Sequence, residues 1–276
     1  MNIVGDLVLI AGFKMNAAGA AIATVAAQAV SVVLSIIIIK RKKLVRINRK
    51  DLCFNDELPG IIKIGIPIGF QELLTQISFM CLVAFINRLG IEASSGYGVA
   101  NKIVAFVMLV PSSLMQSMSS FVSQNVGAKN ERRATKSMLT GMAIGALIGI
   151  FVFLLIFFKG DFVSSIFTDN ENVIRRSYEY LRGFAIEAVV TSVLFSFIGY
   201  FNGHGATMLV MIQGLAQSFL VRLPMSYIMS VQPDASLSMI GLAAPTATVF
   251  GIVLNLVFFI FYQKKLNIKG NENKEN

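Results

Sequence analysis

The sequence predicts an all-α, polytopic membrane helix bundle, and three observations carry this fold class. Of the 276 residues, 55% are hydrophobic and only 14% are charged, whereas an ordinary soluble domain carries about 25% charged residues. The mean hydropathy is +0.71. A helix that crosses a bilayer needs about 20 mostly apolar residues. Stretches of that length and character cover residues 17–39, 61–86, 96–122, 137–158, 183–201, 207–230 and 239–262.

The composition argues against several functions. The net charge of +9 is carried largely by basic residues beside apolar spans, where they set membrane orientation, so we expect no nucleic-acid partner. Two cysteines and one histidine, His204, offer too few ligands for zinc or haem chemistry, so no cofactor is expected beyond a coupling ion. The spans carry no H-E-x-x-H or Ser–His pattern of an intramembrane enzyme. The sequence therefore predicts a protein that is not an enzyme.

The charges of the connecting segments predict the orientation. If the spans alternate across the bilayer, residues 40–60, 129–136 and 263–276 lie on one side and hold 15 Lys and Arg (7, 4 and 4), against 5 on the other side. Basic residues accumulate in cytoplasmic loops. We therefore expect a multi-pass protein of the cell membrane with its C-terminus in the cytoplasm.

A basic linker divides the chain. Residues 40–60 form the one polar connection long enough to separate two bundles, which would comprise residues 1–39 and 61–262, followed by a polar tail at 263–276. Apolar residues within the linker favour a helix lying on the membrane surface, and a solvated charge run fits it equally well.

Two spans share a weak internal similarity. A shift of 222 residues aligns GAAIATVAAQ with GLAAPTATVF and matches Gly19 with Gly241, Ala21 with Ala243 and Thr24 with Thr246. Small residues recur at helix starts for packing reasons alone. If the match reflects a repeat, the chain holds one complete repeat and only the end of the repeat before it.

A further motif follows the third of the predicted spans. The segment SQNVGAKNERRA covers residues 123–134, in which Gly127 suits a helix C-terminal cap and the basic residues suit a cytoplasmic loop. It resembles the Q-N-x-G-A motif, followed by Arg-Ala, of multidrug and toxic compound extrusion (MATE) transporters. The matching residues are Gln124, Asn125, Gly127 and Ala128.

Other segments resemble the same family in the same order. They are N-x-x-x-D at Asn2 and Asp6, GAAIATVAAQ, GIPIGFQE at 65–72 and NGHGAT at 202–207. The resemblance implies twelve helices in two six-helix lobes around a central cleft. It also implies export of small cationic amphipathic compounds in exchange for Na⁺ or H⁺.

Compared with that family, the chain resembles one complete six-helix lobe plus the last one and a half helices of the preceding lobe. We therefore expect an N-terminally truncated member, whose missing lobe another chain could supply. Na⁺-coupled members are similar in carrying acidic residues where this chain has Thr75 and Thr191, whereas its own acids, Glu72 and Glu187, lie about one turn earlier. The resemblance leaves the coupling ion open.

Ionisable residues within apolar spans are functional candidates, because a charge near the bilayer centre costs at least about 2.5 to 3.5 kcal/mol. Glu187 is expected to form an ion pair with Lys102 or Arg222, either as a structural fastening or as part of the transport pathway. Glu72 has no basic residue at matching depth, and it shares an i, i+3, i+4 helix face with Thr75 and Gln76. The predicted substrate and ion pathway comprises Glu72, Thr75, Gln76, Glu187, Thr191 and Lys102.

Three functions remain in competition at this stage. The leading hypothesis is a secondary active exporter that works by alternating access. A lipid-linked oligosaccharide flippase resembles this fold but usually has a more cationic cavity than Lys102 and Arg222 would supply. A non-transporting fragment or partner subunit is the third, because the resemblance implies that most of one lobe would be missing.

Overall fold

The computed structural model describes residues 2–42 and 58–275, with side chains as far as Lys264. The chain divides into two compact units, Met1–Leu58 and Pro59–Asn276. The surface helix that the sequence favours within the linker falls mostly in residues 43–57, outside the described residues. All regular secondary structure in the described ranges is helical, which confirms the all-α prediction.

The first unit is a helical hairpin. It consists of α1 (Asn2–Asp6), a π-helical segment η1 (Leu7–Gly12) and α2 (Asn16–Lys42). The two arms pack closely, because a Cβ added at Gly19 would lie only 3.2 Å from the backbone carbon of Leu9. Small residues permit such close helix contacts in membranes.

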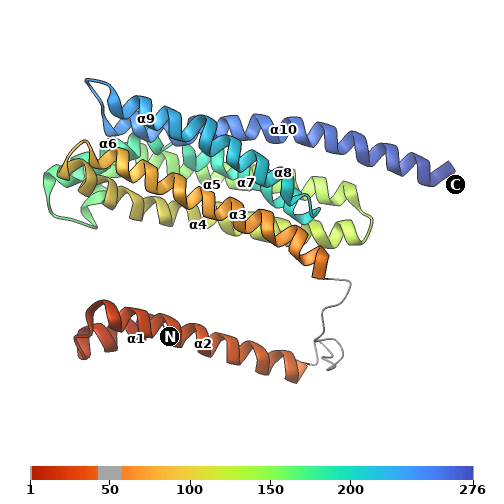
Figure 1. The fold of residues 1–276 in the computed structure, drawn as a ribbon, viewed down its shortest axis with the longest axis horizontal. Helices are drawn as coiled ribbons and strands as arrows, with labels where there is room; N and C mark the ends of the chain where they lie inside the picture. Colours follow the sequence, from red (N-terminus) through yellow and green to blue (C-terminus); the bar gives the residue numbers. More distant parts are fainter. Residues whose placement is uncertain (1, 43–57, 276) are drawn as a thin grey trace. The chain divides into compact units, whose positions relative to one another are not determined.

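The second unit is a bundle of long helices that run side by side (Figure 1). It begins with α3 (Leu58–Asn87), α4 (Ile91–Gly127) and α5 (Glu131–Ser165). The remaining elements are α6 (Glu171–Phe184), α7 (Glu187–Gly203), α8 (Thr207–Leu215), the π-helical segment η3 (Ala216–Arg222), α9 (Leu223–Val231) and α10 (Leu237–Glu275).

Six of the described helices are long and apolar enough to cross a membrane, counting α8 to α9 as one, and α6 with α7 forms a seventh, bent span. The seven predicted stretches thus correspond to helical spans. Three of these spans are irregular. The first is α5, which has a kink at Lys159, where φ of −134° and ψ of 21° are not helical. The helices α6 and α7 meet at an angle of 48°, and π-helical geometry interrupts the span from α8 to α9.

The outer faces of the helices are strongly apolar. On α5, Leu147, Phe151 and Phe158 are between 64% and 70% exposed, whereas Gly145 and Gly149 on the opposite side are buried. Water would penalise so much exposed apolar surface, and lipid does not. The structure therefore presents the surface expected of a bundle embedded in a bilayer.

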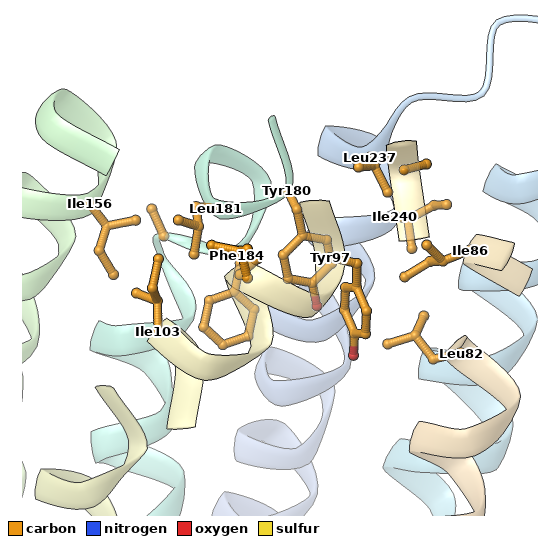
Figure 2. Packing of buried hydrophobic residues seen from close by; sticks show 14 residues of the cluster. Leu82, Ile86, Tyr97, Ile103, Ile156, Tyr180, Leu181, Phe184, Leu237 and Ile240 are labelled. Carbon is orange, nitrogen blue, oxygen red and sulfur yellow. The ribbon is translucent and has the colours of Figure 1, made fainter. Parts of the chain in front are cut away.

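The second unit has two buried hydrophobic clusters, and one of them lies where α3, α4, α5, α6 and α10 converge. Tyr97 of α4 and Tyr180 of α6 meet edge to face, with ring centroids 4.9 Å apart. Figure 2 shows these rings among the aliphatic side chains around them. The buried neighbours include Leu82, Ile86, Ile103, Ile156, Leu181, Phe184, Leu237 and Ile240.

Glycines set the closest helix contacts. A Cβ added at Gly149 of α5 would lie 2.8 Å from Cα of Val189 in α7, and one added at Gly183 of α6 would fall on the backbone carbonyl oxygen of Ser238 in α10. Backbone atoms cannot rotate away as a side chain can. These two glycines therefore allow α5 to pack on α7 and α6 to pack on α10.

We predict that Gly183→Ala destabilises the bundle by about 1 to 3 kcal/mol, as overpacking typically does. The matched control is Gly98→Ala, because Gly98 also lies in a helix and a Cβ there would meet no atom within 4 Å. The stability of both variants is measured by thermal unfolding of the purified protein in detergent. Equal melting temperatures for the two variants would contradict the proposed role of Gly183.

Candidate functional site

A line of buried polar side chains connects three membrane spans in the second unit. Thr248 Oγ1 of α10 donates a hydrogen bond of 2.8 Å to Glu187 Oε1 at the start of α7. Gln217 Nε2 of η3 donates to the same threonine oxygen at 3.2 Å. Gln213 Nε2 of α8 then donates to Gln217 Oε1. All four side chains are buried, and Glu187 is only 4% exposed.

The break between α6 and α7 positions Glu187. Because α7 starts at this residue, the side chain lies in the first turn of the helix, where the backbone N–H groups of residues 188–190 bond the carbonyls of Ala185 and Ile186 across the bend. Thr191 lies one turn further along α7 and is also buried. The bend thus places an acidic side chain and a hydroxyl inside the bundle on one face of α7.

A glycine makes room for the two glutamines. Thr248, Gly251 and Asn255 recur at i, i+3 and i+7, so they share one face of α10. A Cβ at Gly251 would lie 2.5 Å from Gln217 Oε1 and 2.7 Å from Gln213 Nε2. The glutamine side chains therefore pack directly against the backbone of α10.

Several oxygens along this line have no hydrogen-bond partner. They are Glu187 Oε2, Thr191 Oγ1, Gln213 Oε1 and Asn255 Oδ1, each buried. A buried polar atom without a partner costs about 1 to 3 kcal/mol. Such oxygens can accept bonds from a proton carrier or water, or coordinate a small hard cation.

The described residues contain no group of three or more His, Cys, Asp and Glu side chains that could hold a metal. A cation at this site would therefore be held by one carboxylate and neutral oxygens. That donor set has a charge of −1, which suits a monovalent ion or a single proton.

The ion pair expected between Glu187 and Arg222 is not formed. Among the described residues, neither Arg222 nor Lys102 lies within 4.0 Å of a carboxylate oxygen. The Arg222 guanidinium instead lies over the Phe79 ring of α3, with Cζ 5.0 Å from its centroid. Lys102 is exposed. Glu187 takes its hydrogen bond from Thr248, while Arg222 makes a cation–π contact, so the two residues form no direct ion pair, although Arg222 lies near enough to attract Glu187 through coulombic interaction.

The predicted polar face of α3 is present only in part. Gln76 Nε2 donates to Glu72 Oε1 at 3.2 Å, and both side chains are exposed. The Thr75 hydroxyl instead donates to the backbone carbonyl of Gln71 at 2.8 Å. Glu72 and Gln76 therefore form a pair on the surface of the second unit, separate from the buried line.

The Q-N-x-G-A segment builds the turn between α4 and α5. Asn125 is buried, and its Nδ2 donates to the carbonyl of Phe121 at 2.7 Å. The sequence places the helix cap at Gly127, but α4 includes this glycine, and the residue with left-handed geometry is Lys129, with φ of 58°. The cap at Gly127 was therefore a wrong prediction.

The remaining residues of the family motifs contact neighbours within their own unit, as far as the described residues show. The backbone N–H of Ala128 bonds the carbonyl of Gln124, which closes the end of α4. Asp6 belongs to the first unit, where its Oδ1 is buried without a partner. In the same unit Asn2 Nδ2 donates to Thr24 Oγ1 at 3.1 Å, which joins two of the segments that carry the family resemblance.

Sequence reasoning missed Gln213, Gln217, Thr248 and Asn255. The cost of burying a charge singles out the ionisable residues of apolar spans, whereas these four are neutral. A signal is present in the sequence, because neutral amides and hydroxyls are also costly to bury in lipid without partners.

Comparisons with known proteins agree with this architecture. The MatE family model matches residues 67–228. The probable multidrug resistance protein YpnP of Bacillus subtilis is 24% identical over 230 residues, which cover 83% of this chain and 52% of that protein. The multidrug export protein MepA of Staphylococcus aureus is 26% identical over 225 residues, which cover 78% of this chain and 49% of that protein.

Solved structures share the fold. The Vibrio cholerae MATE transporter VcmN superposes with a TM-score of 0.82 at 18% sequence identity, over 96% of this chain and 60% of that one. The chain spans about half the length of the curated relatives it matches. Because the family model covers more than half of these 276 residues, the chain belongs to the MatE family of multidrug and toxic compound extrusion transporters.

Proposed function

We propose that this chain provides the ion-coupled lobe of a secondary active exporter of small cationic amphipathic compounds. The observation that carries the proposal is the buried carboxyl of Glu187, which has one oxygen bonded to Thr248 and the other without a partner. The relatives YpnP and MepA, a probable multidrug resistance protein and a multidrug export protein, support multidrug export as the activity. In this proposal the exporter is completed by a second lobe, and the C-terminus lies in the cytoplasm.

Glu187 is the group that would exchange a proton or Na⁺. As a carboxylate it is a buried charge, which is unfavourable unless a cation neutralises it. When a proton or Na⁺ binds Glu187 Oε2, the charge is neutralised, while Oε1 keeps its hydrogen bond from Thr248. The unpaired oxygens of Thr191, Gln213 and Asn255 offer further ligands for Na⁺ or for its water.

Binding of a proton or Na⁺ to Glu187 would affect three spans, because the hydrogen bonds run from α7 through α10 to η3. The bend between α6 and α7 and the π-helical segment η3 are irregular points at which helices can rearrange. A ligand shifts a conformational equilibrium only through different affinities for the two states. The proposed difference is the geometry of the Thr248 and Gln217 bonds around the loaded carboxyl.

The substrate would meet the exposed pair of Glu72 and Gln76 on α3. An exposed carboxylate on an apolar helix suits a ligand that is both cationic and amphipathic. Lys102 is also exposed, on α4, and would repel cations from its own surroundings. This arrangement separates ion coupling at Glu187 from substrate recognition at Glu72.

The first functional prediction concerns Glu187→Gln. The amide can still accept the bond from Thr248, but it can neither carry the proton nor neutralise a cation. We expect efflux of ethidium, a cationic amphipathic dye, to fall roughly 5- to 150-fold, the range of a coupling free energy of 1–3 kcal/mol. Efflux is measured in cells that lack their own drug pumps and express the full chain at matched membrane levels.

The matched control is Asp234→Asn, which removes one carboxylate from an exposed loop between α9 and α10. It should leave efflux unchanged. Normal efflux by Glu187→Gln would remove Glu187 from coupling. If the unaltered chain exports no dye, export by this chain alone is ruled out, and the partner-subunit alternative is favoured.

A separate prediction concerns Glu72→Gln. A charge pair about 4 Å apart in water is worth roughly 1 kcal/mol, so we expect the half-saturating concentration of ethidium to rise about fivefold. A neutral amphipathic dye should be exported with unchanged affinity. Equal effects on both dyes would show that Glu72 acts through helix packing and not through its charge.

A further inference from the structure

An open groove runs between α4 and α5, away from the buried polar line. Its volume is about 470 Å³, within the range of ligand pockets. The α4 side includes Leu114, Ser117 and Phe121. The α5 side includes Arg133, Lys136 and Ile144.

The groove has the length of one membrane leaflet. Ile144 lies eleven residues beyond Arg133 on α5, which corresponds to about 16 Å along the helix. The hydrocarbon core of a bilayer is about 30 Å thick. A groove that starts at one membrane surface would therefore end near the midplane.

The two ends of the groove differ in charge. Arg133 and Lys136 are one turn apart in the first turns of α5, and the opposite end is lined by Leu114 and Ile144. Arg133 Cζ lies 5.3 Å from the centroid of the Phe121 ring, which holds the guanidinium at the groove. The groove is thus basic at one end and apolar along its length.

The nearby carboxylate does not neutralise these charges. Glu131 Oε2 lies 2.9 Å from His204 Nε2 and is held on the α7 side. Within the described residues, neither Arg133 nor Lys136 has a carboxylate oxygen within 4.0 Å. Both side chains are exposed and available to an external anion.

We propose that this groove binds an anionic phospholipid of the cytoplasmic leaflet, with its phosphate between Arg133 and Lys136 and an acyl chain along Leu114 and Ile144. Basic pockets between helices on the cytoplasmic side suit anionic headgroups. A cationic drug would be repelled by the two basic residues. The identity of the leaflet rests on the proposed orientation, whereas the class of lipid rests on the groove alone.

Native mass spectrometry of the delipidated full chain in detergent tests the proposal, with phosphatidylglycerol and phosphatidylcholine of identical acyl chains as competing probes. We expect phosphatidylglycerol to be retained in clear preference. Each basic residue near an anionic lipid contributes a factor of about five, so Arg133→Gln with Lys136→Gln should weaken phosphatidylglycerol binding roughly 25-fold. Equal retention of the two lipids by the unaltered chain would overturn the proposal without any variant.

The matched control is Lys129→Asn with Arg132→Gln, which removes the same charge from the start of α5 and the turn before it, but from residues that do not line the groove. It should keep the preference for phosphatidylglycerol. Equal losses in the two double variants would show diffuse attraction and refute a site. Circular dichroism checks that each variant retains its helices.

Ser117→Phe tests the apolar part of the groove. Ser117 is exposed, and a ring there would fill the groove while leaving both basic residues in place. We expect retention of long-chain phosphatidylglycerol to fall. Unchanged retention would show that only the headgroup binds, and the acyl-chain assignment would be wrong. Because the measurement is lipid binding, it fails or succeeds independently of dye efflux.

Discussion

The organisation of the candidate site depends on the hydroxyl of Thr248. It donates to Glu187 and accepts from Gln217, so one side chain joins α7, α10 and η3. In lipid, water is not available to replace these bonds, and each polar group must find its partner within the protein. The hydroxyl can serve both neighbours because it is at once a donor and an acceptor.

Hydrogen bonding along this line is incomplete, and the proposed function places ion coupling at its unpaired atoms. Glu187 Oε2 and the side-chain Nδ2 and Oδ1 atoms of Asn255 lack hydrogen-bond partners although they are buried. A purely structural network would be more stable with every member bonded. Glycines elsewhere bring the helix backbones into contact, and this tight packing supports an under-bonded centre without collapse of the bundle.

The second unit also separates its charges by environment. Glu187 is enclosed, Glu72 is exposed on α3, and Arg133 and Lys136 lie at the open end of a groove. The guanidinium of Arg222 lies over the face of Phe79, which attracts it, and it attracts Glu187 through coulombic interaction without a direct ion pair. Charged residues of the same type therefore lie in different environments, buried or exposed, and have different physical roles.

The sequence by itself determined the membrane fold, the seven helical stretches and the family, because the apolar length of a span and short contiguous motifs are local properties of the chain. It also identified Glu187 as an acid within an apolar span, and the structure shows that it is buried. Only the tertiary structure decided that Thr248, and not Arg222, is the partner of Glu187, and that the neutral Gln213 and Gln217 complete the line. Partner choice depends on the rotation and bending of helices far apart in sequence, and the break at α6 and α7 and the π-helical segment η3 leave no periodic signal from which those angles could be read.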